Sequence, residues 1–162
     1  MTQVLAIDPG PEMSAWCHYD ATTRELLAFM EEPNTALLRT LAEGVGVGIP
    51  LVLETMCCMG QRVGKDTFRT AIWIGRFQQA WHSIGGTFHT VERPDIKLAL
   101  CHSRAADDTM VRHALAQYFG FDTPRQAKGT KKQPGPLYGV ANHIWSALAV
   151  AVTWADQQKE EK

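Results

Sequence analysis

Two short apolar runs in this chain each end in an acidic residue. The run Val4–Ile7 leads into Asp8 and a Pro-Gly pair, and the run over residues 49–53 leads into Glu54. A short apolar run closed by turn-forming residues predicts a buried strand that ends at a loop. Because an unpaired charge is costly in a buried strand, each carboxylate is expected to have a partner or a metal ion beside it.

The pattern of polar and apolar positions predicts further strands and helices around these runs. Strands are expected at residues 4–8, 14–19, 24–30, 49–54 and 87–91, the first three as an antiparallel meander. Helices are expected from residue 34 or 35 to 43, from 66 or 67 to 83, over a short stretch from Pro94, from Ser103 to 118 or 119, and from about 141 to 157. The expected N-caps, whose short polar side chains satisfy free amides, are Asn34 or Thr35, Asp66 or Thr67, and Ser103.

The order of these elements indicates one α/β domain over residues 1–162. A strand-helix-strand-helix-strand portion after a meander predicts a mixed sheet with helices packed on its faces. Residues 121–140 hold several prolines and glycines, and we expect a flexible basic loop there. Gly75 lies inside an expected helix, where glycine costs about 1 kcal/mol relative to alanine. We therefore expect it to serve close packing.

The composition is that of an ordinary folded domain. Of the 162 residues, 45% are hydrophobic and 20% are charged, which is enough for a sizeable core. No apolar run approaches membrane-spanning length, and the first residues lack the basic-then-apolar layout of a signal peptide. A cytoplasmic protein is expected, and its four cysteines, which lack CxxC spacing, are expected to be free thiols.

The net charge of −1 argues against a strongly basic nucleic-acid binder, but the charges are segregated along the chain. Basic residues form two clusters, one of Arg62, Lys65, Arg69 and Arg76, the other of Lys128, Lys131 and Lys132. Such clusters are typical either of a phosphate-binding surface or of a solvated loop.

Asp8 and Glu54 can face each other if their strands are neighbours in one sheet. The start of the last expected helix adds Asn142, His143 and Ser146, and the last two are three apart and share a helix face. Two carboxylates with one imidazole favour Mg2+ or Mn2+, and a pair of such ions can hydrolyse a phosphodiester. The alternative is that Asp8 is a turn acid, Glu54 a surface strand end and His143 a histidine bonded to the backbone.

Three stretches together resemble the RuvC family of Holliday-junction resolvases, which belong to the ribonuclease H-like superfamily. They are Ala6-Ile7-Asp8-Pro9-Gly10, Leu53-Glu54 with the later Ile74-Gly75, and Trp145-Ser146-Ala147-Leu148-Ala149-Val150-Ala151. The resemblance spans nearly the whole chain, and the small, diverged form is similar to phage-encoded members. It implies a ribonuclease H-like mixed five-stranded sheet flanked by helices and, for a phage protein, the cytoplasm of a bacterial host.

The resemblance implies a site that binds two Mg2+ ions, with Mn2+ also accepted. Asp8 matches the strand-one acid of the family, Glu54 its strand-four acid and His143 its first helix ligand, a position that some members also fill with histidine. All three are therefore expected as metal ligands and catalytic residues.

The fourth ligand position is left open by the resemblance. Ser146 falls where the family usually has an acid, and this is a departure from the pattern. Ser146 can act as a weak ligand or through water, or Asp107 or Asp108 can be recruited from the neighbouring helix. The preferred role for these two acids, however, is to cap or solvate their own helix.

The resemblance also implies a set of DNA-facing residues. They are Arg62, Lys65, Phe68 and Arg69 after the second strand acid, Lys97 and Arg104 against phosphates, and Lys128, Lys131 and Lys132 in the basic stretch. Phe68 is expected either to stack on an unpaired base or to be a core residue at helical spacing. Phosphate contacts by the three lysines would make binding fall with salt.

Together these expectations describe a homodimeric, metal-dependent, structure-selective endonuclease that acts on four-way or other branched DNA. Two symmetric cuts require two sites, and the helix over 66–83, with Ile72, Trp73 and Phe77, is the expected interface. The alternative for Trp73 is a place in the core. Because Ser146 departs from the family pattern, a branched-DNA-binding protein without catalytic activity is the alternative. Within the enzyme class, RNA–DNA hybrids or flaps are alternative substrates. An actin- or Hsp70-type ATPase needs two such domains, so no nucleotide cofactor is expected, and no membrane partner.

Overall fold

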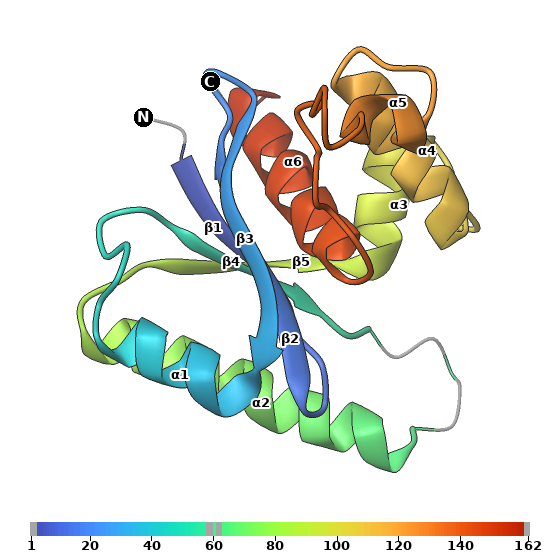
Figure 1. Ribbon diagram of the computed structural model, residues 1–162. Helices are drawn as coiled ribbons and strands as arrows, with labels where there is room; N and C mark the ends of the chain where they lie inside the picture. Colours follow the sequence, from blue (N-terminus) through green and yellow to red (C-terminus); the bar gives the residue numbers. More distant parts are fainter. Residues whose placement is uncertain (1–2, 58–59, 61–62, 161–162) are drawn as a thin grey trace.

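One mixed sheet carries the whole structure (Figure 1). The computed structural model describes residues 3–57, 60 and 63–160. The strands are β1 (Gln3–Asp8), β2 (Met13–Asp20), β3 (Glu25–Pro33), β4 (Leu51–Thr55) and β5 (Phe88–Glu92), in the spatial order β3-β2-β1-β4-β5. The first three pair antiparallel, whereas β4 pairs parallel with both β1 and β5. The mixed five-stranded sheet expected from the sequence is confirmed.

The central strand β1 is apolar at consecutive positions because helices cover both of its faces. Successive side chains of a strand point to opposite faces. Val4 and Ala6 accordingly belong to one hydrophobic cluster, while Leu5 and Ile7 belong to the other. This alternation places the next residue, Asp8, on the face of Val4 and Ala6.

The helices form two layers, one on each face of the sheet (Figure 1). They are α1 (Asn34–Ala42), α2 (Lys65–Ser83), α3 (Arg93–Cys101), α4 (Asp108–Tyr118), α5 (Pro124–Lys128) and α6 (Ile144–Glu160). Helices α1 and α2 cover one face, and α6 crosses the other with α3, α4 and α5 beside it. None of the helices in the described ranges is long and apolar enough to span a membrane.

Helix α6 is the most deeply buried helix because small side chains let it approach the sheet closely. Ala147, Ala151 and Ala155 are fully buried in the cluster that also contains Val4 and Ala6. The first turn of α6 thereby lies beside the carboxyl end of β1.

The expected N-caps of three helices are wrong. Helix α1 begins after Pro33, α2 begins after Gly64, and neither cap residue makes a side-chain cap hydrogen bond. Asn34 is instead buried, where its Oδ1 accepts from Ser14 Oγ at 2.6 Å and its Nδ2 donates to Gly10 O at 2.9 Å. Its side chain therefore holds the turn that follows Asp8.

Helix α4 begins five residues later than the expected cap Ser103. Asp107 is its N-cap, and the carboxylate accepts from the amide of Met110 at 2.8 Å. The capping role that the sequence allowed for Asp107 is thus found.

The stretch 121–140, expected to be a loop, contains helix α5. Thr123 and Gln126 form a reciprocal capping box at its start. Ala127 and Leu137 are fully buried, so apolar anchors fix a segment whose prolines had suggested a loop. Helix α6 also begins at Ile144, three residues later than expected from 141.

The surroundings of Gly75 and the exposure of Phe68 correct two further expectations about α2. An alanine Cβ at Gly75 would meet no atom within 4 Å, so the glycine does not serve close packing within the described chain. The side chain of Phe68 is 62% exposed, which removes the alternative that it is a core residue.

Candidate active site

Asp8 and Glu54 lie at adjacent strand ends on the same face of the sheet. Ile7 pairs with Leu53 in the parallel β1–β4 ladder, so the two acids are the next residues in register. Val52 belongs to the α6-side cluster, and strand alternation places Glu54 on that side too. Both side chains are nearly buried, with 10% of Asp8 and 12% of Glu54 exposed.

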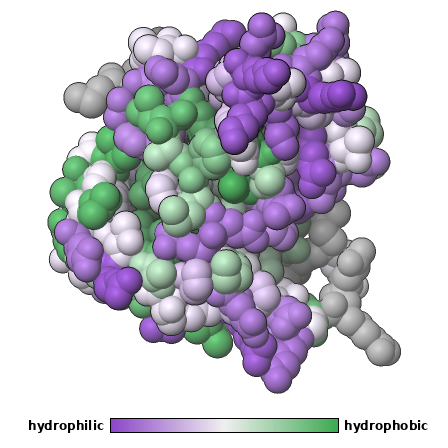
Figure 2. Space-filling view, viewed as in Figure 1, coloured by the Kyte–Doolittle hydropathy of each residue, from purple (hydrophilic) through white to green (hydrophobic). Residues whose placement is uncertain are grey.

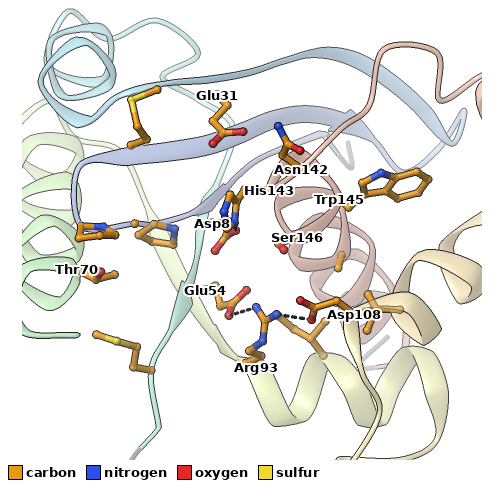
Figure 3. Close-up of a pocket in the computed structure, with 18 of the residues that line it drawn as sticks. Asp8, Glu31, Glu54, Thr70, Arg93, Asp108, Asn142, His143, Trp145 and Ser146 are labelled. Atoms are coloured by element: carbon orange, nitrogen blue, oxygen red, sulfur yellow. Dashed lines mark hydrogen bonds and ion pairs between the residues drawn. The ribbon is translucent and has the colours of Figure 1, made fainter. Parts of the chain in front are cut away.

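These two acids line a cavity of about 1050 Å³ at the carboxyl ends of β1, β4 and β5 (Figure 3). Its wall combines apolar side chains with polar residues from several elements: Glu31, Thr70, Arg93, Lys97, Asp108, Arg112, Asn142, His143 and Ser146. The topology thus brings residues from both ends of the chain into one polar hollow.

His143 makes the contact between the last helix and the first strand. Its Nδ1 lies 3.1 Å from Asp8 Oδ2, and this hydrogen bond raises the pKa of His143. Asn142, just before it, adopts a left-handed φ of 44°, which turns the chain into α6. Ser146 lines the same cavity one turn further along.

Arg93 bridges two carboxylates on the other side of the cavity (Figure 3). Its Nη1 donates to Glu54 Oε1 at 3.0 Å, and its Nη2 donates to Asp108 Oδ1 at 2.6 Å. Arg93 follows the last residue of β5, so three neighbouring parallel strands each deliver a charged residue to this edge.

Glu54 has the most perturbed carboxyl group of the site. Burial, and after it the negative charge of Asp8, raise the pKa of Glu54 to about 7. Arg93 acts in the opposite direction but does not offset the other two effects. A buried like-charge pair of this kind gains from a bound cation.

Of the three residues considered for the fourth position, two line the cavity. Ser146 and Asp108 are both in its wall. Asp107 is taken up by the cap of α4. Asp108 is held through Arg93, whereas the Ser146 side chain makes no hydrogen bond with any described residue.

The expected DNA-facing residues are spread over several surfaces. Lys97 lines the cavity, Lys128 lines a second hollow, and Lys65, Lys131 and Lys132 are exposed outside both. Arg69 pairs with Glu12 at 3.4 Å and with Asp66 at 4.0 Å, and Arg104 pairs with Asp95 at 3.3 Å. Arg62 lies outside the described residues.

Sequence reasoning missed Arg93 and Glu31. Arg93 follows a strand run as the two acids do, and this position was the signal that could have found it. Glu31 lies on β3 and its charge contributes to the raised pKa of His143. No pattern in the chain marks Glu31, because β3 is a mostly exposed edge strand.

The comparisons with known proteins agree with this fold. No family model matches the chain, and no curated protein matches it either. A solved structure of Thermus thermophilus RuvC has a TM-score of 0.71 at 16% identity, covering 98% of this chain and 96% of that one. T. thermophilus RuvC in complex with a Holliday junction substrate has the same TM-score and identity, with 99% and 97% covered.

The chain therefore has a ribonuclease H-like fold, the α/β class that its sheet order and helix layers define. Within that class its structural likeness is to RuvC, as the sequence motifs had indicated. At 16% identity this likeness concerns the fold.

The donor set fits a divalent cation in chemical type. As they stand, no three Asp, Glu, His or Cys side chains among the described residues are close enough to hold a metal together. The carboxylate oxygens already have hydrogen-bond partners: Asp8 is bonded to His143, and Glu54 is bonded to Arg93. A cation would relieve the repulsion between the two acids, and oxygen-rich ligands favour Mg2+.

Proposed function

We propose that this protein is a metal-dependent, structure-selective DNA endonuclease that cuts Holliday junctions or other branched DNA. The observation that carries the proposal is the buried pair Asp8 and Glu54, held side by side at the edge of a RuvC-like sheet. A raised carboxyl pKa in an open polar cavity is a mark of functional sites.

Asp8, Glu54 and His143 would hold the ions, two per site in the full proposal, with Mg2+ preferred and Mn2+ accepted. The ions would supply water activation and charge stabilisation at the leaving oxygen, giving a 5′-phosphate and a 3′-hydroxyl. For an ion to bind, Glu54 must first release its proton. Its carboxylate must then contact both the ion and Arg93. Lys97, which lines the cavity, is placed to bind a phosphate of the strand.

We also propose a two-fold dimer with α2 in its interface. Ile72 is 63% exposed and lies one helical turn from the exposed Phe68, whereas Phe77, also expected in the interface from the sequence, is fully buried and cannot take part. Two exposed large apolar side chains on one helix face support an interaction surface. A two-fold axis would present two sites to the two strands that a symmetric resolution cuts.

The second candidate is a branched-DNA-binding protein that does not cut. Two observations favour it: Ser146 stands where the family usually has an acid, and Arg93 already occupies Glu54 and Asp108. This candidate would use the same DNA-binding surface as the first and would differ only in that it does not hydrolyse the phosphodiester.

The deciding experiment is incubation of the purified protein with a labelled four-way junction and with a linear duplex of the same arm sequence, in Mg2+, Mn2+ or EDTA. The nuclease predicts paired, symmetric nicks in the junction that disappear in EDTA. Tight junction binding without cleavage in either metal would support the second candidate, and absence of binding would remove both.

A further inference from the structure

A second hollow lies beside the candidate active site, between α4, α5 and the start of α6. It measures about 530 Å³, and its wall includes Thr109, Arg112, His113, Arg125, Lys128 and Trp145. Figure 2 shows mostly hydrophilic residues over the upper right of the molecule, where Figure 1 places α4 and α5.

The cationic side chains of this hollow are unpaired. Arg112, Arg125 and Lys128 form no side-chain hydrogen bond or ion pair with any described residue. No carboxylate of the described chain lines the hollow. By contrast, Arg69, Arg93 and Arg104 all have acidic partners. Three unpaired cations around one concavity favour an anionic ligand.

The hollow is continuous in its lining with the cavity of Asp8 and Glu54. Arg112 and Trp145 belong to the walls of both. A chain of regularly spaced anions could therefore pass from one to the other across Arg112. A polynucleotide backbone is such a chain, whereas a single small anion would use only one of the two hollows.

The backbone that carries Arg125 and Lys128 is held in place by local contacts within residues 123–135. The capping box of Thr123 and Gln126 starts α5, and Gly129 then returns the chain through a bridge to Pro134. An alanine Cβ at Gly135 would collide with the carbonyl of Ala127, so the segment after α5 lies tightly against that helix. Arg125 and Lys128 are thus presented from a compact unit.

We infer that the hollow of Arg112, Arg125 and Lys128 binds backbone phosphates of the nucleic-acid strand that leaves the Asp8–Glu54 cavity. This inference rests on the proposed DNA-binding function and adds a binding site to it. Phosphate contacts of this type are independent of sequence, and they hold the strand in register with the cutting site.

The test is a binding titration of a labelled four-way junction in EDTA, at several salt concentrations, by fluorescence anisotropy. The variant Arg112→Gln/Arg125→Gln is compared with wild type and with Arg39→Gln, which removes an exposed arginine of α1 on the opposite face of the sheet. Loss of two phosphate contacts should raise Kd roughly tenfold at 0.1 M salt and reduce the slope of log Kd against log salt by about 1.8. Arg39→Gln should leave both unchanged.

Junctions that each carry one neutral methylphosphonate linkage locate the contact. At one or more positions, the neutral linkage should weaken binding by wild type but not by the double variant. Wild-type binding and slope in a double variant with unchanged circular dichroism would overturn this inference and leave the proposed function standing. A wild-type protein that does not bind the junction would overturn the proposed function and this inference with it.

Discussion

His143 Nδ1 lies 3.1 Å from Asp8 Oδ2, although the two residues are 135 positions apart in the chain. One belongs to the entry of the last helix and the other to the end of the first strand. The contact exists because α6 packs its small residues on β1 with its first turn at the strand end. The geometry of the candidate site therefore depends on how α6 packs in the core.

Replacing His143 by aspartate tests its place as a ligand. His143→Asp should preserve or raise Mg2+-supported cleavage, because a carboxylate is a harder ligand for this ion. Without metal, the variant should be less stable by about 0.5–1 kcal/mol, since it replaces the hydrogen bond to Asp8 by a like charge at a side chain that is 69% exposed to solvent. Urea unfolding in EDTA measures this, with the exposed His82→Asp as control. An inactive but folded variant would count against the ligand assignment.

Neutral versions of the two strand acids should separate cutting from binding. Asp8→Asn and Glu54→Gln should each lower the cleavage rate by at least about a hundredfold, as even residues behind a metal ligand commonly cost ~10–100-fold. Junction affinity in EDTA should remain within a few-fold, because no carboxylate is needed to hold phosphates. Glu92→Gln, at the exposed end of β5, is the matched control and should cut normally. Full activity of either site variant would remove that residue from the mechanism.

The raised pKa of Glu54 makes stability depend on pH. Its pKa rises from 4.5 to about 7 on folding, so the folded protein binds the proton more tightly than the unfolded chain. The resulting stability is fully present below pH 4.5 and is lost as pH rises through 7, by up to about 3 kcal/mol. Urea unfolding of metal-free protein at pH 5 and pH 8 measures the loss.

Two comparisons isolate the contribution of Glu54 to this pH profile. Glu54→Gln should flatten the profile and be more stable than wild type at pH 8. Saturating Mg2+ should also stabilise wild type at pH 8, since the ion takes the place of the proton. An unchanged slope in Glu54→Gln would assign the pH dependence to other groups.

Arg93 is expected to oppose cation binding at the site. Its guanidinium contacts Glu54 at 3.0 Å, so Arg93→Gln should raise Mg2+ affinity severalfold at pH 9, which lies above the pKa of about 7 of Glu54 in the wild type. Isothermal titration with Mg2+ measures the change without any need for cleavage. Arg104→Gln, which removes an exposed arginine paired with Asp95, serves as control. Weaker Mg2+ binding in Arg93→Gln would show instead that the arginine positions Glu54 for the ion.

Gly75→Ala should stabilise the protein by about 0.5–1 kcal/mol, because the glycine lies in a helix and an added Cβ meets nothing within 4 Å. The rise in Tm should be about 1–4 °C for a chain of this size. Gly86→Ala is the opposite case, since its Cβ would run into the indole of Trp81. A destabilised Gly75→Ala would mean that another surface packs against α2, such as a second copy of the chain.

Much of this architecture was predictable because strands and turns leave local signatures. The runs ending at Asp8 and Glu54 predicted both strand ends, and the meander that begins with the first run predicted the antiparallel half of the sheet. Strand alternation fixes the face of each acid relative to its own run, but not which faces of the two strands coincide. The pairing of β1 with β4 was only a condition in the sequence reasoning, because no local pattern specifies which strands become neighbours.

Helix starts and the Arg93 bridge were harder to predict for physical reasons. Asn34 has the side chain of an N-cap, but tertiary bonds to Ser14 and Gly10 use it elsewhere. Phe68 fits an apolar helical stripe, yet α2 is long enough to extend its first turns past the sheet into solvent. Arg93 connects acids 39 and 15 positions away, and such a contact is fixed only by the fold.

The parallel ladder between β1 and β4 divides the site into a fixed half and an adjustable half. Asp8 and Glu54 are attached to the middle of the sheet, so they can separate only if the central backbone hydrogen bonds break. Amide hydrogen exchange at Ile7 and Leu53 should then be as slow as global unfolding allows. Arg93 and Asp108 stand at the first turns of α3 and α4, and the contact of Arg93 with Glu54 joins side chains only, so it can break without any change in the sheet.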